Sequence, residues 1–309
     1  MRGRLLLLSL TILLSASSRA GQIPSPSPTP QASPTPTPTP EPTPDTAAFL
    51  VPAEEHFSHR SIGAIDLVAN PQEIDAAIEL YRKALLADPW NIEVLAKLMR
   101  SLQFRGAYTN LGLEEKKVLF DEGRRLGQAA VDRLEAEASA AHGLSRIEAL
   151  RLVKGAPALY LWTAVHWGEW GLAKGKFASA RSGVAGRLRD LAQTLIEMDP
   201  LFDEAAGYRL LGKLHSEAPK ILFITGWISH EKGVQYLRRA DKAAPDNPVT
   251  CAFLAEALLD HEPGKKDEAR ELLEHCVSLT PRPDRILEDS MYLGDAHALL
   301  EKLRAAPAR

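Results

Sequence analysis

The sequence predicts an all-α protein in which antiparallel helix pairs follow one another, as a curved solenoid or a compact helical bundle. Three observations predict this class. Apolar residues recur at helical spacing almost everywhere from Thr46 onward, proline repeatedly ends these stretches, and a new apolar stripe begins after each of those prolines. The 309 residues are enough for one or two domains with a sizeable core.

The first twenty residues have the pattern of a secretory signal peptide. Arg2 and Arg4 form a positive region, the range 5–14 is a short apolar stretch, and the range 18–20 (Ser-Arg-Ala) places small residues where a signal peptidase cuts. No cysteine follows the apolar stretch, so we expect no lipid attachment there. Residues 1–20 are therefore predicted to be a signal peptide, with an uncleaved membrane anchor as the alternative.

Residues 21–45 are predicted to be a linker. The stretch IPSPSPTPQASPTPTPTPEPTPD alternates proline with serine or threonine and cannot build a core. Because proline fixes φ, we expect extended polyproline II of about 3.1 Å per residue, on the order of 70 Å in all. A signal followed by a spacer predicts a periplasmic or otherwise exported protein, whose helical domain spans residues 46–309.

The first two strongly periodic stretches are residues 72–87 and 91–105. Each has an apolar stripe at spacings of three, four and seven residues. Asp88-Pro89 is predicted to end the first helix, because proline disfavours helix at the residue before it. Gly106 is predicted to close the second helix.

Predicted helices also end at Pro200, Pro245 and Pro281. Three helix pairs also share a small residue, a large apolar one, a second small one and a terminal proline at the same offsets. These sets are Ala77, Tyr81, Ala84 and Pro89; Gly233, Leu237, Ala240 and Pro245; and Ala269, Leu273, Cys276 and Pro281. The pattern resembles tetratricopeptide (TPR) units of about 34 residues, which makes a TPR-like array of helix pairs the predicted fold.

The chain has two cysteines, Cys251 and Cys276. Cys251 is near the start of a predicted helix at 247–260, and Cys276 is near the end of the next one at 264–279. In an antiparallel pair these two positions are adjacent, so the side chains are expected to meet. Export permits a disulfide between them, and a pair of buried free thiols is the alternative.

The order of segments resembles a narrower family. A central helix with a Tyr/Trp…Trp-Gly pattern precedes a helix ending in EMDP, an AAGYRLLGKL helix and an apolar connection that starts at Pro219. Over roughly residues 70–300 this is similar to the TatT family, the T component of TPR-protein-associated TRAP transporters. The resemblance implies a periplasmic partner of a TRAP solute-binding protein that holds an apolar small molecule. The family's members are commonly lipoproteins, and this chain departs from them in having no lipid-attachment cysteine; a homo-oligomer stays an open alternative.

No motif predicts catalysis, a metal or a cofactor. His56 and His59 have the i, i+3 spacing of a ligand pair, but no second ligand pair is evident near them and HExxH is absent. Residues 171–179 look like a phosphate loop, but a P-loop needs glycine where Trp170 stands. A net charge of -3 gives no reason to expect nucleic acid as a partner. The chain is therefore predicted not to be an enzyme.

The stretch YLWTAVHWGEWG at residues 160–171 is the most unusual part of the sequence. On a helical wheel its large rings share one arc of roughly 160°, and the opposite side carries small and aliphatic residues. Buried tryptophan and tyrosine need hydrogen-bond partners, which favours the wall of a partly hydrated cavity; filling of an ordinary core is the alternative. His166 and Glu169 suit a hydrogen bond as readily as acid–base chemistry.

The connection PKILFITGW at residues 219–227 is too apolar for an exposed loop and is expected to plug the array or to line an apolar pocket. We therefore expect one pocket walled by this connection and by helix 156–173, which holds an apolar or amphipathic ligand. Its predicted residues are Tyr160, Trp162, His166, Trp167, Trp170, Tyr208, Phe223 and Trp227. A protein–protein scaffold in envelope assembly is the alternative function.

Overall fold

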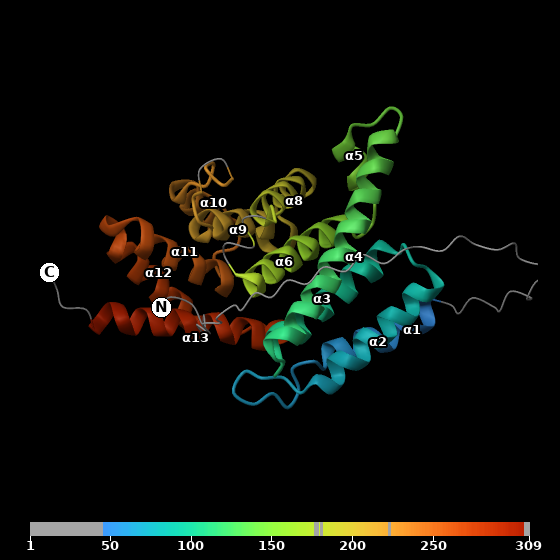
Figure 1. Cartoon of the computed structure of the whole chain (residues 1–309). Helices are drawn as coiled ribbons and strands as arrows, with labels where there is room; N and C mark the ends of the chain where they lie inside the picture. Colours follow the sequence, from blue (N-terminus) through green and yellow to red (C-terminus); the bar gives the residue numbers. More distant parts are fainter. Residues whose placement is uncertain (1–45, 176–178, 180–181, 222–223, 306–309) are drawn as a thin grey trace, which may run out of the picture. The chain divides into compact units, whose positions relative to one another are not determined.

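The computed structural model describes residues 46–175, 179, 182–221 and 224–305, and these residues form an array of α-helices (Figure 1). The predicted signal peptide (1–20) and linker (21–45) lie outside the described residues. Within the described part, extended pairing is limited to one isolated bridge between Ile65 and Val68. The all-α class is therefore confirmed. No helix among the described residues is both long enough and apolar enough to span a bilayer.

The helices follow one another in the expected pairwise manner. In chain order they are α1 (Thr46–Ser58), α2 (Pro71–Ala87), α3 (Ile92–Tyr108), α4 (Leu113–Ala140), α5 (Arg146–Arg151), α6 (Ala156–Lys174), α8 (Val184–Met198), α9 (Phe202–Glu217), α10 (His230–Ala243), α11 (Pro248–His261), η1 (Pro263–Lys265), α12 (Lys266–Ser278), η2 (Pro283–Arg285) and α13 (Ile286–Ala305). From α1 to α4 and from α8 to α13, each α-helix packs against the next, while α4 packs mainly on α6.

Asparagine begins several of these helices, as its side-chain chemistry predicts. The side-chain oxygens of Asn70, Asn91 and Asn247 accept hydrogen bonds from backbone N–H groups of the first turns of α2, α3 and α11, at 3.0, 3.2 and 2.9 Å. These bonds satisfy N–H groups that have no partner within the helix, which stabilises each start by about 1 kcal/mol.

The predicted end of the second helix at Gly106 is wrong. Gly106 is buried inside α3, which continues to Tyr108. A Cβ atom at this glycine would lie 2.5 Å from the Phe120 ring of α4. The glycine therefore allows close approach of two helices, and the sequence signal of a helix end was misleading because the same residue type serves both purposes.

The two cysteines lie in adjacent helices, as expected, and both are buried. Cys251 Sγ donates to the carbonyl of Leu272 at 3.3 Å, and Cys276 Sγ points to the carbonyl of Pro248 at 3.8 Å. A hydrogen bond to Cys276 together with burial raises the pKa of the Cys251 thiol. The structure has both as free thiols, so the disulfide stays a prediction.

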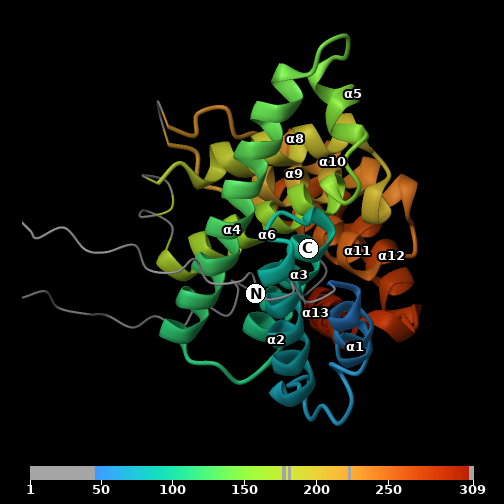
Figure 2. The same ribbon diagram turned by 90° about the vertical axis from the view of Figure 1, so that its right-hand side faces the viewer.

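Helix α13 contacts both ends of the array. Its later residues pack on α11 and α12, where Leu300 joins the core around the cysteines. Its first turn reaches α1–α3, because Leu287 is buried in the cluster that also contains Phe57 and Phe104 (Figures 1 and 2). The last helix therefore covers residues that are roughly two hundred positions away in the chain.

A part-buried ion pair accompanies this contact. Arg60, in the turn that follows α1, is only 3% exposed, and its Nη2 lies 2.8 Å from Glu288 Oε1 in α13. Arg60 also donates to the backbone carbonyls of Phe57 and Asp284. The guanidinium lies over the rings of Phe57 and Phe104, with its central carbon 4.3 and 5.1 Å from their centroids.

A left-handed turn begins α9. Asp203, Glu204 and Ala205 have φ of 47°, 57° and 63°, which costs an L-residue about 1–2 kcal/mol each. Arg209 Nη1 donates to the carbonyl of Glu204 at 2.9 Å, and its Nη2 donates to the carbonyl of Asp203 at 3.2 Å. Arg285 contributes an ion pair with the Asp203 carboxylate. Arginines therefore hold this unfavourable backbone in place.

Replacing Arg60 with methionine should lower the free energy of unfolding by about 3 kcal/mol, because it leaves the Glu288 carboxylate part-buried without its cation. The matched control is Arg82→Met, which breaks an ion pair with Glu122 whose arginine side chain is 50% exposed, and should cost less than about 1 kcal/mol. Urea unfolding followed by circular dichroism measures both. Equal, small losses would mean that docking of α13 on α1 contributes little to stability.

Candidate functional site

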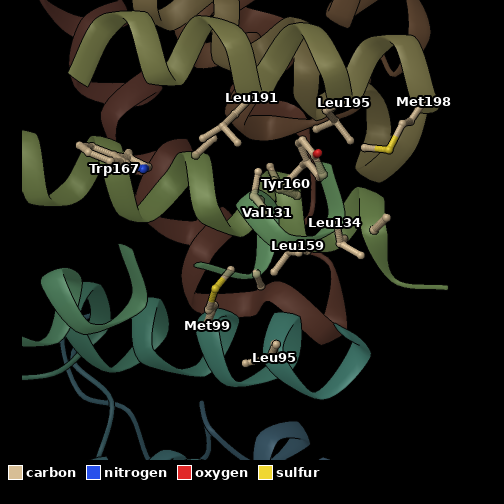
Figure 3. Close-up of a cluster of buried hydrophobic side chains, with 14 of the residues drawn as sticks. Leu95, Met99, Val131, Leu134, Leu159, Tyr160, Trp167, Leu191, Leu195 and Met198 are labelled. Carbon is tan, nitrogen blue, oxygen red and sulfur yellow. The ribbon is translucent and has the colours of Figure 1, made fainter. Parts of the chain in front are cut away.

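The aromatic helix α6 lies between α3, α4 and α8, and most of its rings fill the core (Figure 3). Tyr160 is 1% exposed, and its hydroxyl donates to Glu135 Oε1 of α4 at 2.6 Å. Trp167 is 7% exposed, and its Nε1 donates to Gln128 Oε1 of α4 at 2.9 Å. The polar groups of both rings are thus satisfied by side chains of one neighbouring helix, without a hydrated cavity.

Trp170 is also buried and meets Trp167 edge-on, with ring centroids 5.6 Å apart and an interplanar angle of 84°. The Arg124 guanidinium lies over both rings, 4.7 Å from the Trp167 centroid and 4.5 Å from that of Trp170. Such an arrangement of two rings and a cation stabilises packing of α4 on α6.

His166 is completely buried. Its Nε2 donates to the carbonyl of Met99 in α3 at 2.8 Å, and its Nδ1 has no hydrogen-bond partner among the described residues. A Cβ atom at Gly123 would lie 2.3–2.5 Å from the ring, so only glycine at that position of α4 leaves room for it. Burial lowers the pKa of His166 to about 4. The ring is therefore neutral near pH 7 and occupies a structural position.

Two other predicted residues belong to a separate aromatic cluster. Tyr208 of α9 stacks on Tyr236 of α10, with ring centroids 6.3 Å apart. Trp227 meets His215 of α9 edge-on at 5.4 Å, and the Arg189 guanidinium lies over the Trp227 ring. Phe223 lies outside the described residues. The predicted pocket residues are thus not brought together at one place.

Trp162 is the one described residue of the predicted pocket that lines the cavity beside α3. Its side chain lines a space of about 250 Å³ and also packs against the core cluster that contains Tyr160 and Trp167. The cavity lies between α1, α2, α3, α6 and the start of α9. Its lining consists of Glu54, Phe57, Tyr81, Glu93, Ala96, Lys97, Arg100, Gly155, Ala158, Leu161, Trp162, Phe202, Asp203 and Arg285.

Most charged groups of this cavity are already paired. Lys97 contacts Glu54. Glu93 Oε2 lies 2.9 Å from Lys154 Nζ, and Arg285 pairs with Asp203. The carboxylates of the lining therefore have cationic partners.

Arg100 is the exception in the described part of the chain, because no carboxylate there lies within ion-pair distance of its guanidinium. The group lies over the Phe57 ring, 4.5 Å from the centroid. Burial, together with the neighbouring cations Arg60 and Arg285, lowers the pKa of Arg100 from its ordinary value. The Glu288 and Asp203 carboxylates partly offset this shift, but they pair with Arg60 and Arg285, so the part-buried Arg100 has no ion-pair partner of its own among the described residues. An anionic group in the cavity would supply one.

The sequence contained no local signal for this cavity. Its residues come from positions between 54 and 285, and each belongs to an ordinary helical stripe or helix start. An arginine within an otherwise apolar helix, as at position 100, was the one available hint, and long arginine side chains often reach solvent from such positions.

The histidines considered as metal ligands have another role. His56 Nδ1 lies 2.8 Å from Glu73 Oε2 and ties α1 to α2. His59 lines a small neighbouring pocket of about 200 Å³ that also touches Glu73. Across the described residues, no group of three or more histidine, cysteine or acidic side chains has the geometry of a metal site.

A scan against protein-family models finds no match for the sequence, and a search of curated proteins finds none either. Among solved structures, the chain is similar to TTC0263, a thermophilic TPR protein of Thermus thermophilus. The TM-score is 0.51 at 15% identity, and the alignment covers 84% of this chain and 100% of that one. The chain has a TPR-like fold.

A second structure, the TPR2AB domain of yeast Sti1 in its pHSP90 complex, gives a TM-score of 0.29 at 13% identity, over 84% of this chain and 98% of that one. The similarity to TTC0263 supports the fold alone, because only 15% of the aligned residues are identical. The resemblance to the TatT family stays a hypothesis.

The TPR-like arrangement explains the three sets of offset residues in the sequence. Every small and large apolar member of these sets is buried, including Ala77, Gly233 and Cys276. At Gly233 the reason is direct, because a Cβ atom would lie 2.5 Å from Ser216 Oγ of α9. The small residues therefore set how closely the two helices of a pair approach.

The buried His166 predicts loss of stability in acid. Its pKa falls from 6.5 in the unfolded chain to about 4 in the folded protein, so below pH 6.5 the unfolded state binds a proton that the folded state does not. This contribution should lower the free energy of unfolding by about 3 kcal/mol between pH 7 and pH 4. Urea unfolding across this range measures it.

The control for that measurement is a pair of glutamine variants. His166→Gln should remove this part of the pH dependence, whereas His142→Gln, at an exposed position, should retain it. A pH dependence that is the same in His166→Gln and in the unmodified protein would contradict the assignment.

Proposed function

We propose that this protein is an exported TPR-like scaffold that binds a segment of a partner protein, with the cavity beside Trp162 as the contact point. The observation that carries the proposal is the Arg100 guanidinium, which lies in that cavity over Phe57 without a carboxylate partner among the described residues. The TPR-like fold supports a role in protein binding in general. The charged and apolar pattern of residues 1–20 supports export.

The size of the cavity favours a small part of a partner over a whole ligand. Its volume of about 250 Å³ lies just below the range of about 300–1,000 Å³ that small-molecule sites occupy. One or two side chains, or the end of a polypeptide, fill such a space. Phe57, Trp162 and Phe202 provide an apolar wall, and Arg100 provides a cation. The occupant that matches both is an apolar residue beside a carboxylate.

The cavity is also held in a fixed shape. Arg285, on its rim, is paired with Asp203 in the left-handed turn, and Arg60 ties the end of α1 to α13. A rigid site loses little conformational entropy when it binds. Arg100 itself is part of α3, in the middle of a helix, so its cation is presented by a regular element.

The test uses synthetic peptides in pairs that differ only at the C-terminus, as a free carboxylate or an amide, each with an apolar last residue. Peptides with the carboxylate should bind more tightly. Arg100→Gln should weaken them about tenfold or more, because a hydrogen bond to a charged group contributes about 1.5–3 kcal/mol. Isothermal titration calorimetry gives the affinities.

The matched control is Arg82→Gln, which removes a half-exposed arginine outside the cavity and should leave binding unchanged. Equal affinity for carboxylate and amide peptides, or equal binding by Arg100→Gln and the unmodified protein, would sink this proposal.

The second candidate is the role implied by the TatT resemblance, in which the protein pairs with a periplasmic solute-binding protein of a TRAP-type transporter and holds an apolar small molecule. The specific observation in its favour is that Trp162 and Leu161 of the aromatic helix face the cavity together with Phe57 and Phe202. The volume restricts such a ligand to a small one.

Native mass spectrometry of the purified protein tests this second role. A retained ligand should appear as extra mass that Trp162→Ala removes. Trp167→Ala is the matched control, since this ring is core and its loss should lower stability by about 3–5 kcal/mol without a direct effect on the cavity. Protein without extra mass in either form, combined with peptide binding, would favour the scaffold.

A further inference from the structure

The connection between α1 and α2 carries a two-residue hairpin, with Asp66 and Leu67 at its turn. The backbone N–H of Ile65 donates to the carbonyl of Val68 at 3.0 Å, and the N–H of Val68 donates to the carbonyl of Ile65 at 2.8 Å. In Figures 1 and 2 the connection extends as a loop beyond the ends of α1 and α2. Residues 65–68 are named the hairpin tip below.

The backbone of the hairpin tip suits one of its two central residues. Asp66 and Leu67 have φ of 50° and 63°, in the left-handed region that glycine, asparagine and aspartate adopt far more readily than leucine. The Leu67 side chain is 42% exposed, so contacts within the chain give little in return for this conformation. A leucine that is both strained and exposed suggests a contact outside its own chain.

The surroundings of Leu67 are apolar except for one carboxylate. Ile62, Ile65 and Val68 are exposed as well. Single apolar residues on a surface are ordinary, whereas a group of them marks an interaction site. Asp66 is exposed beside them, and its carboxylate forms no ion pair among the described residues. The hairpin tip therefore presents an apolar side chain next to a carboxylate.

The cavity beside Trp162 has the complementary chemistry. Arg100 has no ion-pair partner of its own among the described residues, and Phe57, Trp162 and Phe202 form the apolar wall. The occupant expected there is an apolar residue beside a carboxylate, which is what Asp66 and Leu67 offer. A volume of about 250 Å³ is enough for one or two side chains.

The hairpin tip and the cavity of one chain are kept apart. None of residues 62–68 lines the cavity. The N–H of Ala69 donates to the carbonyl of Tyr108 at 2.7 Å, which attaches the connection to the end of α3. Tyr108 lies about two helical turns beyond Arg100, roughly 12 Å along the axis. This attachment holds the hairpin tip away from the Arg100 of its own chain.

We infer that the hairpin tip docks into the cavity of a second copy of this chain, with Asp66 beside Arg100 and Leu67 against Phe57 and Trp162. The inference rests on the proposed function, because it uses the same cavity, and it names the partner as another copy. The two halves of the contact are different surfaces of one chain, so the interface is heterologous.

The carboxylate at the turn favours a protein cavity over a lipid surface as the place where the hairpin tip is buried. Insertion of Leu67 into a bilayer would bring Asp66 with it, away from water and without a cation. In the cavity the same carboxylate meets Arg100, and a carboxylate–guanidinium pair is among the stronger charge-assisted hydrogen bonds.

Sedimentation equilibrium at protein concentrations up to about 1 mM, which detects millimolar affinities, tests the association. Leu67→Asn should weaken it about tenfold or more, because the leucine side chain is then no longer buried at the interface. Asparagine is well suited to a positive φ, so the hairpin itself is retained. The matched control is Leu152→Asn, at a leucine that is 76% exposed after α5, and it should leave the association unchanged.

A double-mutant cycle tests the charged half of the contact. Asp66→Asn and Arg100→Gln should each weaken association about tenfold. The double variant should lose about as much as either single variant, because the two side chains contact each other across the interface. Losses that multiply to about a hundredfold would contradict this pairing.

A photoreactive leucine analogue at position 67 locates the contact directly. In a mixture of unlabelled and 15N-labelled copies, crosslinks between copies should join position 67 to peptides that contain Phe57, Trp162 or Phe202. Crosslinks between copies at other positions only would contradict the proposed docking.

Three further results would overturn the inference. They are a protein that stays monomeric throughout the concentration range, an association that Leu67→Asn does not change, and a monomeric protein whose hairpin tip binds phosphatidylcholine vesicles. The peptide titrations separate this inference from the proposed function. A monomeric protein whose Arg100 still selects carboxylate peptides refutes the second copy as partner and leaves the proposed function intact.

Discussion

The left-handed turn at the start of α9, and the arginines that hold it, are the constraint on which the arrangement of the helices depends. The turn directs the carbonyls of Asp203 and Glu204 toward Arg209, and places the Asp203 carboxylate beside Arg285. The Glu204 carboxylate receives Asn247 at the start of α11 and Arg282 before α13. One short segment in an unfavourable conformation thus fixes the positions of α9, α11 and α13. The cost of its backbone is offset by charge-assisted hydrogen bonds, which are about twice as strong as neutral ones.

This network also explains the character of the cavity beside Trp162. Asp203 is used by Arg285 and Arg209, and Glu288 is used by Arg60, so the carboxylates nearest to Arg100 already have partners. Arg100 therefore has no ion-pair partner of its own among the described residues, because Arg60, Arg209 and Arg285 already use these carboxylates. A fold that needed only a packed core would have less reason to retain a buried cation at this position. The ion pairs that attach α13 therefore also determine the charge that faces the cavity.

The sequence predicts the helices well because helical signals are local. Proline at positions 89, 245 and 281, asparagine caps and spacings of three and four residues lie within one or two turns of the structure that they specify. Gly106 shows the limit, since the same glycine signals a helix end or the approach of another helix, here Phe120. The cavity could not be predicted, because Phe57, Arg100 and Arg285 meet only through the packing of α13. For YLWTAVHWGEWG the wheel places the rings on one arc, but α3, α4 and α8 all pack on α6, so rings of that arc contact different neighbours.

The two aromatic clusters differ in whether their polar and charged neighbours are paired within the protein. This difference distinguishes a packing role from a binding role. The polar atoms of Tyr160 and Trp167 donate hydrogen bonds to Glu135 and Gln128, so each ring has its hydrogen-bond partner within the protein. Around Phe57 the charges are arginines, and one of them lacks its counterpart.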